Sequence, residues 1–151
     1  MANTQAMCTS FKGELLVGHH NFGTGVVRAA TTADSFKAAL YLASATINAS
    51  TTAYTATGEV SGTGYTAGGV AVTNATASAT SGTTAYWTPS ASISYTSVTL
   101  TTAFDCVLIY NSTQSNKAVS VHTFGSQTVT AGTFTLTMPT NDSSTGLIRL
   151  A

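Results

Sequence analysis

Charged side chains are scarce in this sequence. Only 7% of the 151 residues are Asp, Glu, Lys or Arg, whereas about a quarter are charged in an average soluble protein. Five basic and five acidic residues give a formal net charge of +0. A surface that binds nucleic acid needs several Lys or Arg to neutralise phosphates, so we expect no nucleic-acid partner. The hydrophobic fraction of 43% excludes the intrinsically disordered class, which is polar and highly charged.

Long apolar runs, export signals and cysteines are also few. Apolar runs such as Cys106 to Tyr110 are much shorter than the roughly 18 residues of a membrane helix, so we expect no membrane contact. The first residues have neither the basic nor the apolar region of a signal peptide, and we expect synthesis in a cytoplasm. Two distant cysteines, Cys8 and Cys106, are then expected to be buried, reduced thiols.

One segment has the pattern of a helix. From Thr4 to Val17 the apolar residues recur at spacings of three and four and form one stripe, at Met7, Cys8, Phe11, Leu15 and Leu16. Gly18 lies where a helix C-cap is expected. We therefore predict an N-terminal helical arm, residues 1–18, and a β-sandwich domain, residues 19–151. The arm packs either on its own sheet or on a neighbouring molecule.

The rest of the sequence has the patterns of short strands. Residues 36–42 alternate with period two, which predicts one buried face. Residues 104–110 are almost continuously apolar and predict a central strand that is covered on both faces. Residues 43–69 lack alternation and are expected to form a long surface excursion. About eight strands separated by Gly and Pro predict an all-β fold, a jelly-roll-like antiparallel β-sandwich; the other runs begin near Val70, Thr84, Ile93, Val119, Val129 and Leu147.

No constellation of residues predicts catalysis. Asp105 and His122 are the best acid–base pair, each in a predicted strand, but no Gly-x-Ser-x-Gly motif supplies a nucleophile. The adjacent His19 and His20 would point in different directions and seldom share a metal ion. We therefore predict that the chain is not an enzyme and has no metal site and no cofactor.

Aromatic and apolar residues supply candidates for partner contact. Trp87, with Tyr86 and Tyr95 nearby, is expected either to face a sugar or to lie in the core or an interface. Tyr54 and Tyr65, in the long excursion, are candidate interface anchors. Phe11 and Leu15 would serve the same purpose on the arm.

Several segments resemble a family of virion proteins. They are residues 1–6 (MANTQA), 35–41 (SFKAALY), 58–62 (GEVSG) with 65–69 (YTAGG), and 119–125 (VSVHTFG). Together they are similar to the capsid cement, or decoration, proteins of short-tailed bacteriophages, over nearly the whole chain. The matching segments are turns and strand patterns, and they carry no catalytic or binding residue.

The resemblance implies a jelly-roll subunit that oligomerises on the outer surface of the phage head. Its partners would be the major capsid protein and further copies of itself, as a dimer or a trimer, and its location would be the virion. A subunit of this kind stabilises the shell by bridging neighbouring capsomers. The alternative is a head or tail fibre, or receptor-binding module, with a carbohydrate-contacting β-sandwich.

Overall fold

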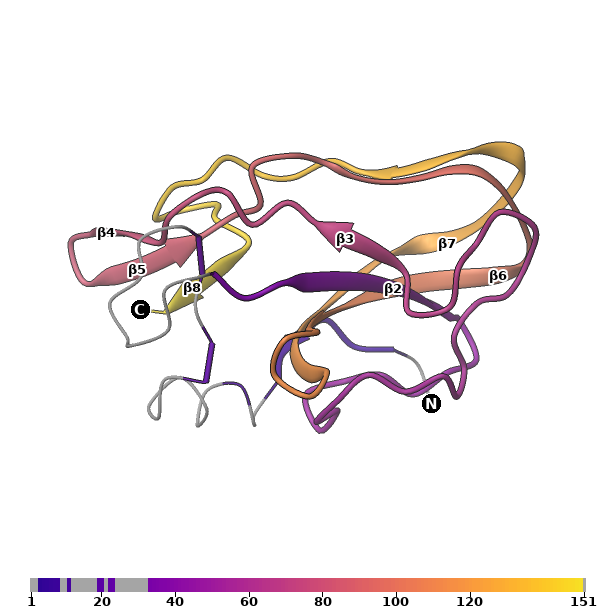
Figure 1. Cartoon of the computed structure of the whole chain (residues 1–151), viewed down its shortest axis with the longest axis horizontal. Helices are drawn as coiled ribbons and strands as arrows, with labels where there is room; N and C mark the ends of the chain where they lie inside the picture. Colours follow the sequence, from indigo (N-terminus) through magenta and orange to yellow (C-terminus); the bar gives the residue numbers. More distant parts are fainter. Residues whose placement is uncertain (1–2, 9–10, 12–18, 21, 24–32, 151) are drawn as a thin grey trace.

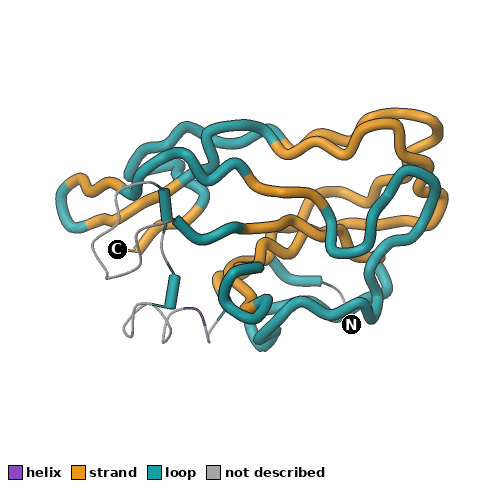
Figure 2. Tube along the Cα trace, in the orientation of Figure 1, coloured by secondary structure: helices purple, strands orange, loops and turns teal. Residues whose placement is uncertain are grey.

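The described part of the chain, residues 3–8, 11, 19–20, 22–23 and 33–150 of a computed structural model, is built from antiparallel strands (Figures 1 and 2). No helix among these residues is long and apolar enough to cross a membrane. This architecture confirms the predicted all-β sandwich class. The eight strands are β1 (Ala6–Met7), β2 (Phe36–Leu42), β3 (Val70–Val72), β4 (Ala79–Ser81), β5 (Thr84–Trp87), β6 (Ile93–Asn111), β7 (Lys117–Leu136) and β8 (Ile148–Leu150).

The strands form two sheets. The larger sheet has five strands in the order β1-β7-β6-β2-β3, and the smaller has three in the order β4-β5-β8. Figure 1 shows the smaller sheet at one end of the molecule, beyond the ends of β2 and β3. The C-terminal strand β8 thus completes a sheet that begins far earlier in the sequence, at β4.

A long bent hairpin forms much of the molecule. Strands β6 and β7 contain 19 and 20 residues, and a straight strand of that length would extend about 60 Å. Instead the register shifts repeatedly between Tyr95 and Cys106, and Ser97 and Ala131 adopt positive φ. Such bulges bend and twist a strand pair. Figure 1 shows the pair curving round at one end and returning over β2 and β3. The hairpin therefore contributes to both layers of the sandwich.

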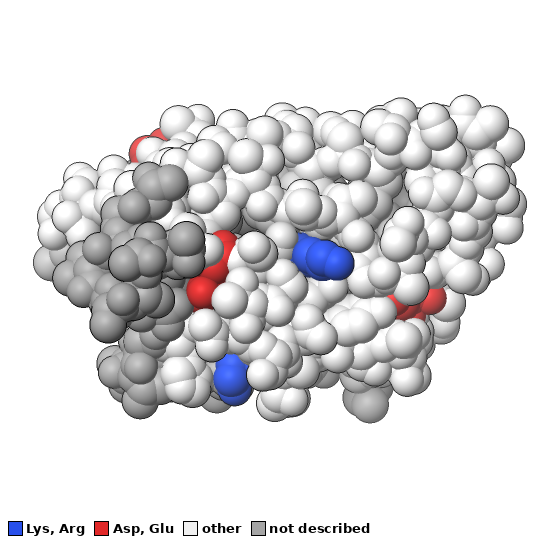
Figure 3. All heavy atoms as spheres, viewed as in Figure 1, with Lys and Arg blue, Asp and Glu red and all other residues white. Residues whose placement is uncertain are grey.

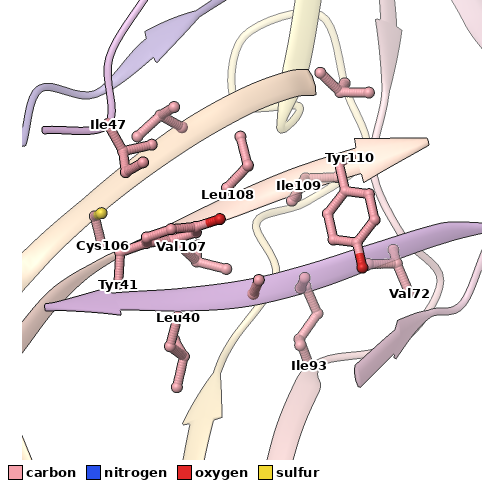
Figure 4. Close-up of a cluster of buried hydrophobic side chains, with 14 of the residues drawn as sticks. Leu40, Tyr41, Ile47, Val72, Ile93, Cys106, Val107, Leu108, Ile109 and Tyr110 are labelled. Carbon is pink, nitrogen blue, oxygen red and sulfur yellow. The ribbon is translucent and has the colours of Figure 1, made fainter. Parts of the chain in front are cut away.

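Strand β2 is buried on both faces, so the prediction of a single buried face is wrong. Ala39 and Tyr41 are as fully buried as Ala38 and Leu40. Figure 4 shows Leu40 on one side of β2 and Ile47, from the long excursion, on the other. The excursion covers the face that the alternation pattern assigned to solvent. The central position predicted for residues 104–110 is confirmed, since they lie in β6 between β2 and β7 and are buried except for a half-buried Asp105.

The N-terminal segment is not helical where its first residues are described. Ala6–Met7 forms β1 and pairs antiparallel with Ser120 and Val121 of β7. A short isolated helix is marginal in water, whereas the edge of β7 offers backbone hydrogen-bonding partners to an extended segment. This corrects the predicted helix start and places β1 on the chain's own sheet. Residues 9–10 and 12–18 of the predicted arm lie outside the described residues.

Candidate functional site

A cluster of tyrosines surrounds Glu59 in the long excursion. The Glu59 carboxylate accepts hydrogen bonds from Tyr54 Oη at 2.6 Å, Tyr65 Oη at 2.7 Å and the Gly68 amide at 2.8 Å. The Tyr54 ring stacks on Tyr110, with centroids 4.9 Å apart. The Tyr65 hydroxyl also accepts a hydrogen bond from the Leu40 amide of β2, at 3.0 Å. These contacts attach the excursion to the central strands of the sheet.

The phenols of this cluster remain protonated at neutral pH. Burial, and then the hydrogen bond to Glu59, raises the pKa of Tyr54 to about 12. The same two causes raise the pKa of Tyr65, and burial raises those of Tyr41, Tyr95 and Tyr110. Each phenol that faces Glu59 is therefore a donor to a carboxylate. The arrangement suits a structural attachment, and the half-buried Tyr54 and Tyr65 rings keep only part of their surface for a partner.

Asp105 and His122 bind different partners. Asp105 Oδ1 accepts a hydrogen bond from Asn3 Nδ2 at 2.5 Å, whereas His122 Nε2 lies 2.9 Å from Ser120 Oγ. Burial lowers the pKa of His122 to about 4, so its imidazole is neutral at pH 7. The two residues thus serve separate hydrogen bonds in the described structure.

The two adjacent histidines also take separate roles. His20 Nδ1 lies 3.2 Å from Asn111 Nδ2, and Asn111 Nδ2 also donates to Asp34 Oδ2 at 2.8 Å. His19 Nδ1 is buried without a hydrogen-bond partner. In the described segments, no three His, Cys, Asp or Glu side chains gather closely enough to hold a metal ion. The buried network around Asn111 joins residues 20 and 34 to the end of β6.

Phe11 and Trp87, two of the predicted contact residues, are core residues. The Trp87 ring is 2% exposed, packs against Phe22 at a centroid distance of 4.9 Å, and donates through Nε1 to the Thr76 carbonyl at 2.9 Å. Phe11 is fully buried, and its ring meets that of Phe22 edge to face. Of the two expectations for Trp87, the structure therefore supports the core position. Leu15 lies outside the described residues.

Both cysteines are buried thiols. Burial raises the pKa of Cys106 to about 12, which makes this thiol unreactive at neutral pH. Cys8 Sγ lies 4.0 Å from the Asn48 carbonyl oxygen. Their positions are those of small core residues.

The outer surface of the described chain carries few charges. Arg149 is the only charged residue that is exposed among those described, and the others are half-buried or buried. Figure 3 shows isolated charged groups on a face that is otherwise uncharged. Hydroxyl side chains take their place, above all along the returning part of the hairpin, at Ser94, Thr96, Thr130, Thr133 and Thr135.

An apolar pocket of about 240 Å³ opens beside β7. It lies where the two halves of the bent hairpin face each other, and its floor includes Val107 and Ile109 of β6. His122 lines it from β7. Several of its apolar side chains are only half-buried, although they belong to the edge of the core: Phe124, Leu136, Met138 and Leu147.

Neither this pocket nor the Glu59 cluster was indicated directly by the sequence patterns. The alternation of Thr with Phe134 and Leu136 predicts a strand with one apolar face, but alternation does not tell an edge strand from a central one. For Glu59, the only available signal was a carboxylate between two tyrosines in a segment without periodicity.

Comparisons of the chain with protein-family models, with curated proteins and with solved structures find no match.

Proposed function

We propose that this chain is a structural virion protein, a cement or decoration subunit that binds the outer surface of a bacteriophage head. The observation that carries the proposal is the scarcity of charge on the described surface, where Arg149 is the most exposed charged residue and Lys37, Lys117 and Asp142 are partly exposed. Soluble proteins ordinarily rely on charge to remain dispersed. A surface of hydroxyl and apolar groups instead suits a subunit that is covered by copies of itself and by a larger shell.

The interior supports a structural function rather than a catalytic one. Two acidic side chains, Glu59 and Asp34, accept hydrogen bonds that hold separate segments of the chain together. The fibre alternative, with sugars stacked on Trp87, is not favoured because that ring is buried. The residues that resemble virion proteins lie partly in β2 and in the turn beside Glu59, where they build the fold.

The proposed mechanism is stabilisation by binding the assembled state. Each subunit would bury hydroxyl and apolar surface across a junction between copies of the major capsid protein. Many weak contacts on a symmetric shell add through avidity. A ligand that binds only the assembled shell stabilises it by mass action, so rupture of the shell requires these contacts to break first.

The test is made on purified particles. We expect hundreds of copies of this chain per virion, a lower rupture temperature after it is stripped, and recovery of that temperature when purified chain is added back. A few copies per particle would favour the fibre alternative. Absence from particles, or an unchanged rupture temperature after stripping, would contradict the proposal.

A further inference from the structure

The apolar pocket lies between the two layers of the bent hairpin. The paired residues Val107 and His122 line it from one part of the hairpin, and the paired residues Ile93 and Leu136 line it from the part that returns. The pocket measures about 240 Å³. Protein interiors are close-packed and contain few spaces larger than a water molecule, so an opening of this size beside the core is unusual.

The lining of the apolar pocket contains no Asp, Glu, Lys or Arg. Its polar side chains are those of Gln5, His122, Thr123 and Thr137, and the remainder are hydrophobic. An engineered apolar cavity of about 150 Å³ stays dry and binds benzene. The larger pocket of this chain therefore has room for one aromatic ring that carries a substituent.

Two side chains of the lining favour an aromatic occupant. Phe124 belongs to a cluster of rings, with centroids 6.0 Å from Phe104 and 5.1 Å from Phe134, and aromatic rings in contact gain more than the burial of their area. Met138 supplies a thioether, and thioethers make favourable contacts with ring edges. A flat ring also suits a space between two sheet layers, which pack about 10 Å apart.

His122 is the only titratable side chain in the lining. Its Nε2 lies 2.9 Å from Ser120 Oγ, which orients the imidazole and leaves Nδ1 for a further partner. Burial lowers the pKa of His122 to about 4, so the imidazole is neutral at pH 7. A neutral imidazole has one donor and one acceptor nitrogen, and a hydroxyl group can pair with either.

The same lining disfavours a charged occupant. A carboxylate or an ammonium group would lose its hydration and meet no opposite charge in the pocket, which is costly. Ligand pockets in proteins combine a mainly apolar lining with a few polar groups that fix the orientation of the ligand. An apolar pocket with a single oriented imidazole has this composition.

We propose that the apolar pocket binds a small uncharged phenol. The ring contacts the hydrophobic lining, and the hydroxyl group forms a hydrogen bond with Nδ1 of His122. The binding is non-covalent. It goes beyond the proposed virion function, and either can hold without the other.

The test is a nuclear magnetic resonance titration of the isotope-labelled chain with p-cresol, and with toluene as the matched ligand that lacks the hydroxyl group. We expect saturable shifts at the pocket residues Val107, Ile109 and Leu136, with a dissociation constant for p-cresol of about 1 mM or lower. Toluene should bind about fivefold more weakly, which corresponds to the loss of one neutral hydrogen bond.

Three variants locate the site. Leu136→Trp adds an indole at a half-buried position of the lining, and Val129→Trp is the matched control at a half-buried position of β7 outside the lining. We expect the affinity for p-cresol to fall about tenfold or more in Leu136→Trp, because the indole takes the space of the ligand ring, and to be unchanged in Val129→Trp. His122→Phe keeps a ring and removes both nitrogens, so it should bind p-cresol and toluene equally.

Several results would overturn the inference. They are the absence of saturable shifts with p-cresol, shifts that map away from the apolar pocket, and equal weakening by the two tryptophan variants. Equal affinity of the wild-type chain for p-cresol and toluene would refute the contact with His122 and the assigned class of ligand. Circular dichroism checks that each variant is folded, and the shift map of the wild type decides the question if Leu136→Trp does not fold.

Discussion

Replacing Glu59 by alanine tests whether the tyrosine cluster holds the long excursion on the sheet. Glu59 accepts three hydrogen bonds, from Tyr54, Tyr65 and Gly68. A hydrogen bond to a charged group contributes about 1.5–3 kcal/mol. Because the carboxylate is only half-buried, water replaces part of this. We expect Glu59→Ala to lower the free energy of unfolding by about 3 kcal/mol.

Two further variants separate the charge from the packing. Glu59→Gln retains a carbonyl oxygen at nearly the same place and removes the charge, so we expect a loss of about 1 kcal/mol. Tyr54→Phe keeps the ring that stacks on Tyr110 and removes only the hydroxyl. In a double-mutant cycle with Glu59→Ala, its coupling energy should exceed about 1 kcal/mol, because the two groups are in direct contact.

The assay is equilibrium unfolding in urea, followed by fluorescence. Trp87 is the only tryptophan in the sequence and is buried, so its emission reports exposure of the core. Far-ultraviolet circular dichroism checks that the unfolding is two-state. A change below about 0.5 kcal/mol for Glu59→Ala, the range of ordinary surface substitutions, would refute the structural importance of the cluster.

Three more predictions concern backbone and ionisation. Gly69 has φ +73°, and a Cβ added there would lie 1.7 Å from the Ala38 carbonyl oxygen, whereas one added at Gly125 meets nothing within 4 Å. In urea titrations we expect Gly69→Ala to lower the free energy of unfolding by more than about 3 kcal/mol. A loss equal to that of Gly125→Ala would contradict the close approach. His122 has a lowered pKa of about 4, so its contribution to stability is complete above pH 6.5 and is lost as the pH falls towards 4. Relative to His122→Gln, the wild type should lose at most about 3 kcal/mol of unfolding free energy over that interval. Parallel profiles of unfolding free energy against pH for the two proteins would exclude this. Raised tyrosine pKa values, such as about 12 for Tyr54, favour the unfolded state as the pH rises above 10; absorbance at 295 nm should therefore increase together with unfolding, and phenol ionisation in a chain that stays folded would argue against the burial.

The fold class could be predicted because it follows from local patterns. Alternation in residues 36–42 and the apolar run in residues 104–110 indicate strands, whatever their neighbours are, since side chains alternate across a pleated strand. The patterns did not show that the runs starting at Ile93 and near Phe104 are one strand with bulges. They also missed the short strands β1 and β4, whose residues form strands because partners exist in β7 and β5.

Composition and local periodicity by themselves determined that this is a sheet protein with few charges and no recognisable catalytic motif. Tertiary structure alone decided which surfaces are covered. It buried both faces of β2, placed Phe11 and Trp87 in the core, gathered tyrosines around Glu59, and left the outer half of β7 paired on one side only within the described residues. The reason is that each of these outcomes depends on which segments become neighbours. Strand neighbours are selected by packing and hydrogen bonding between residues far apart in the chain, and a local pattern contains no record of that choice.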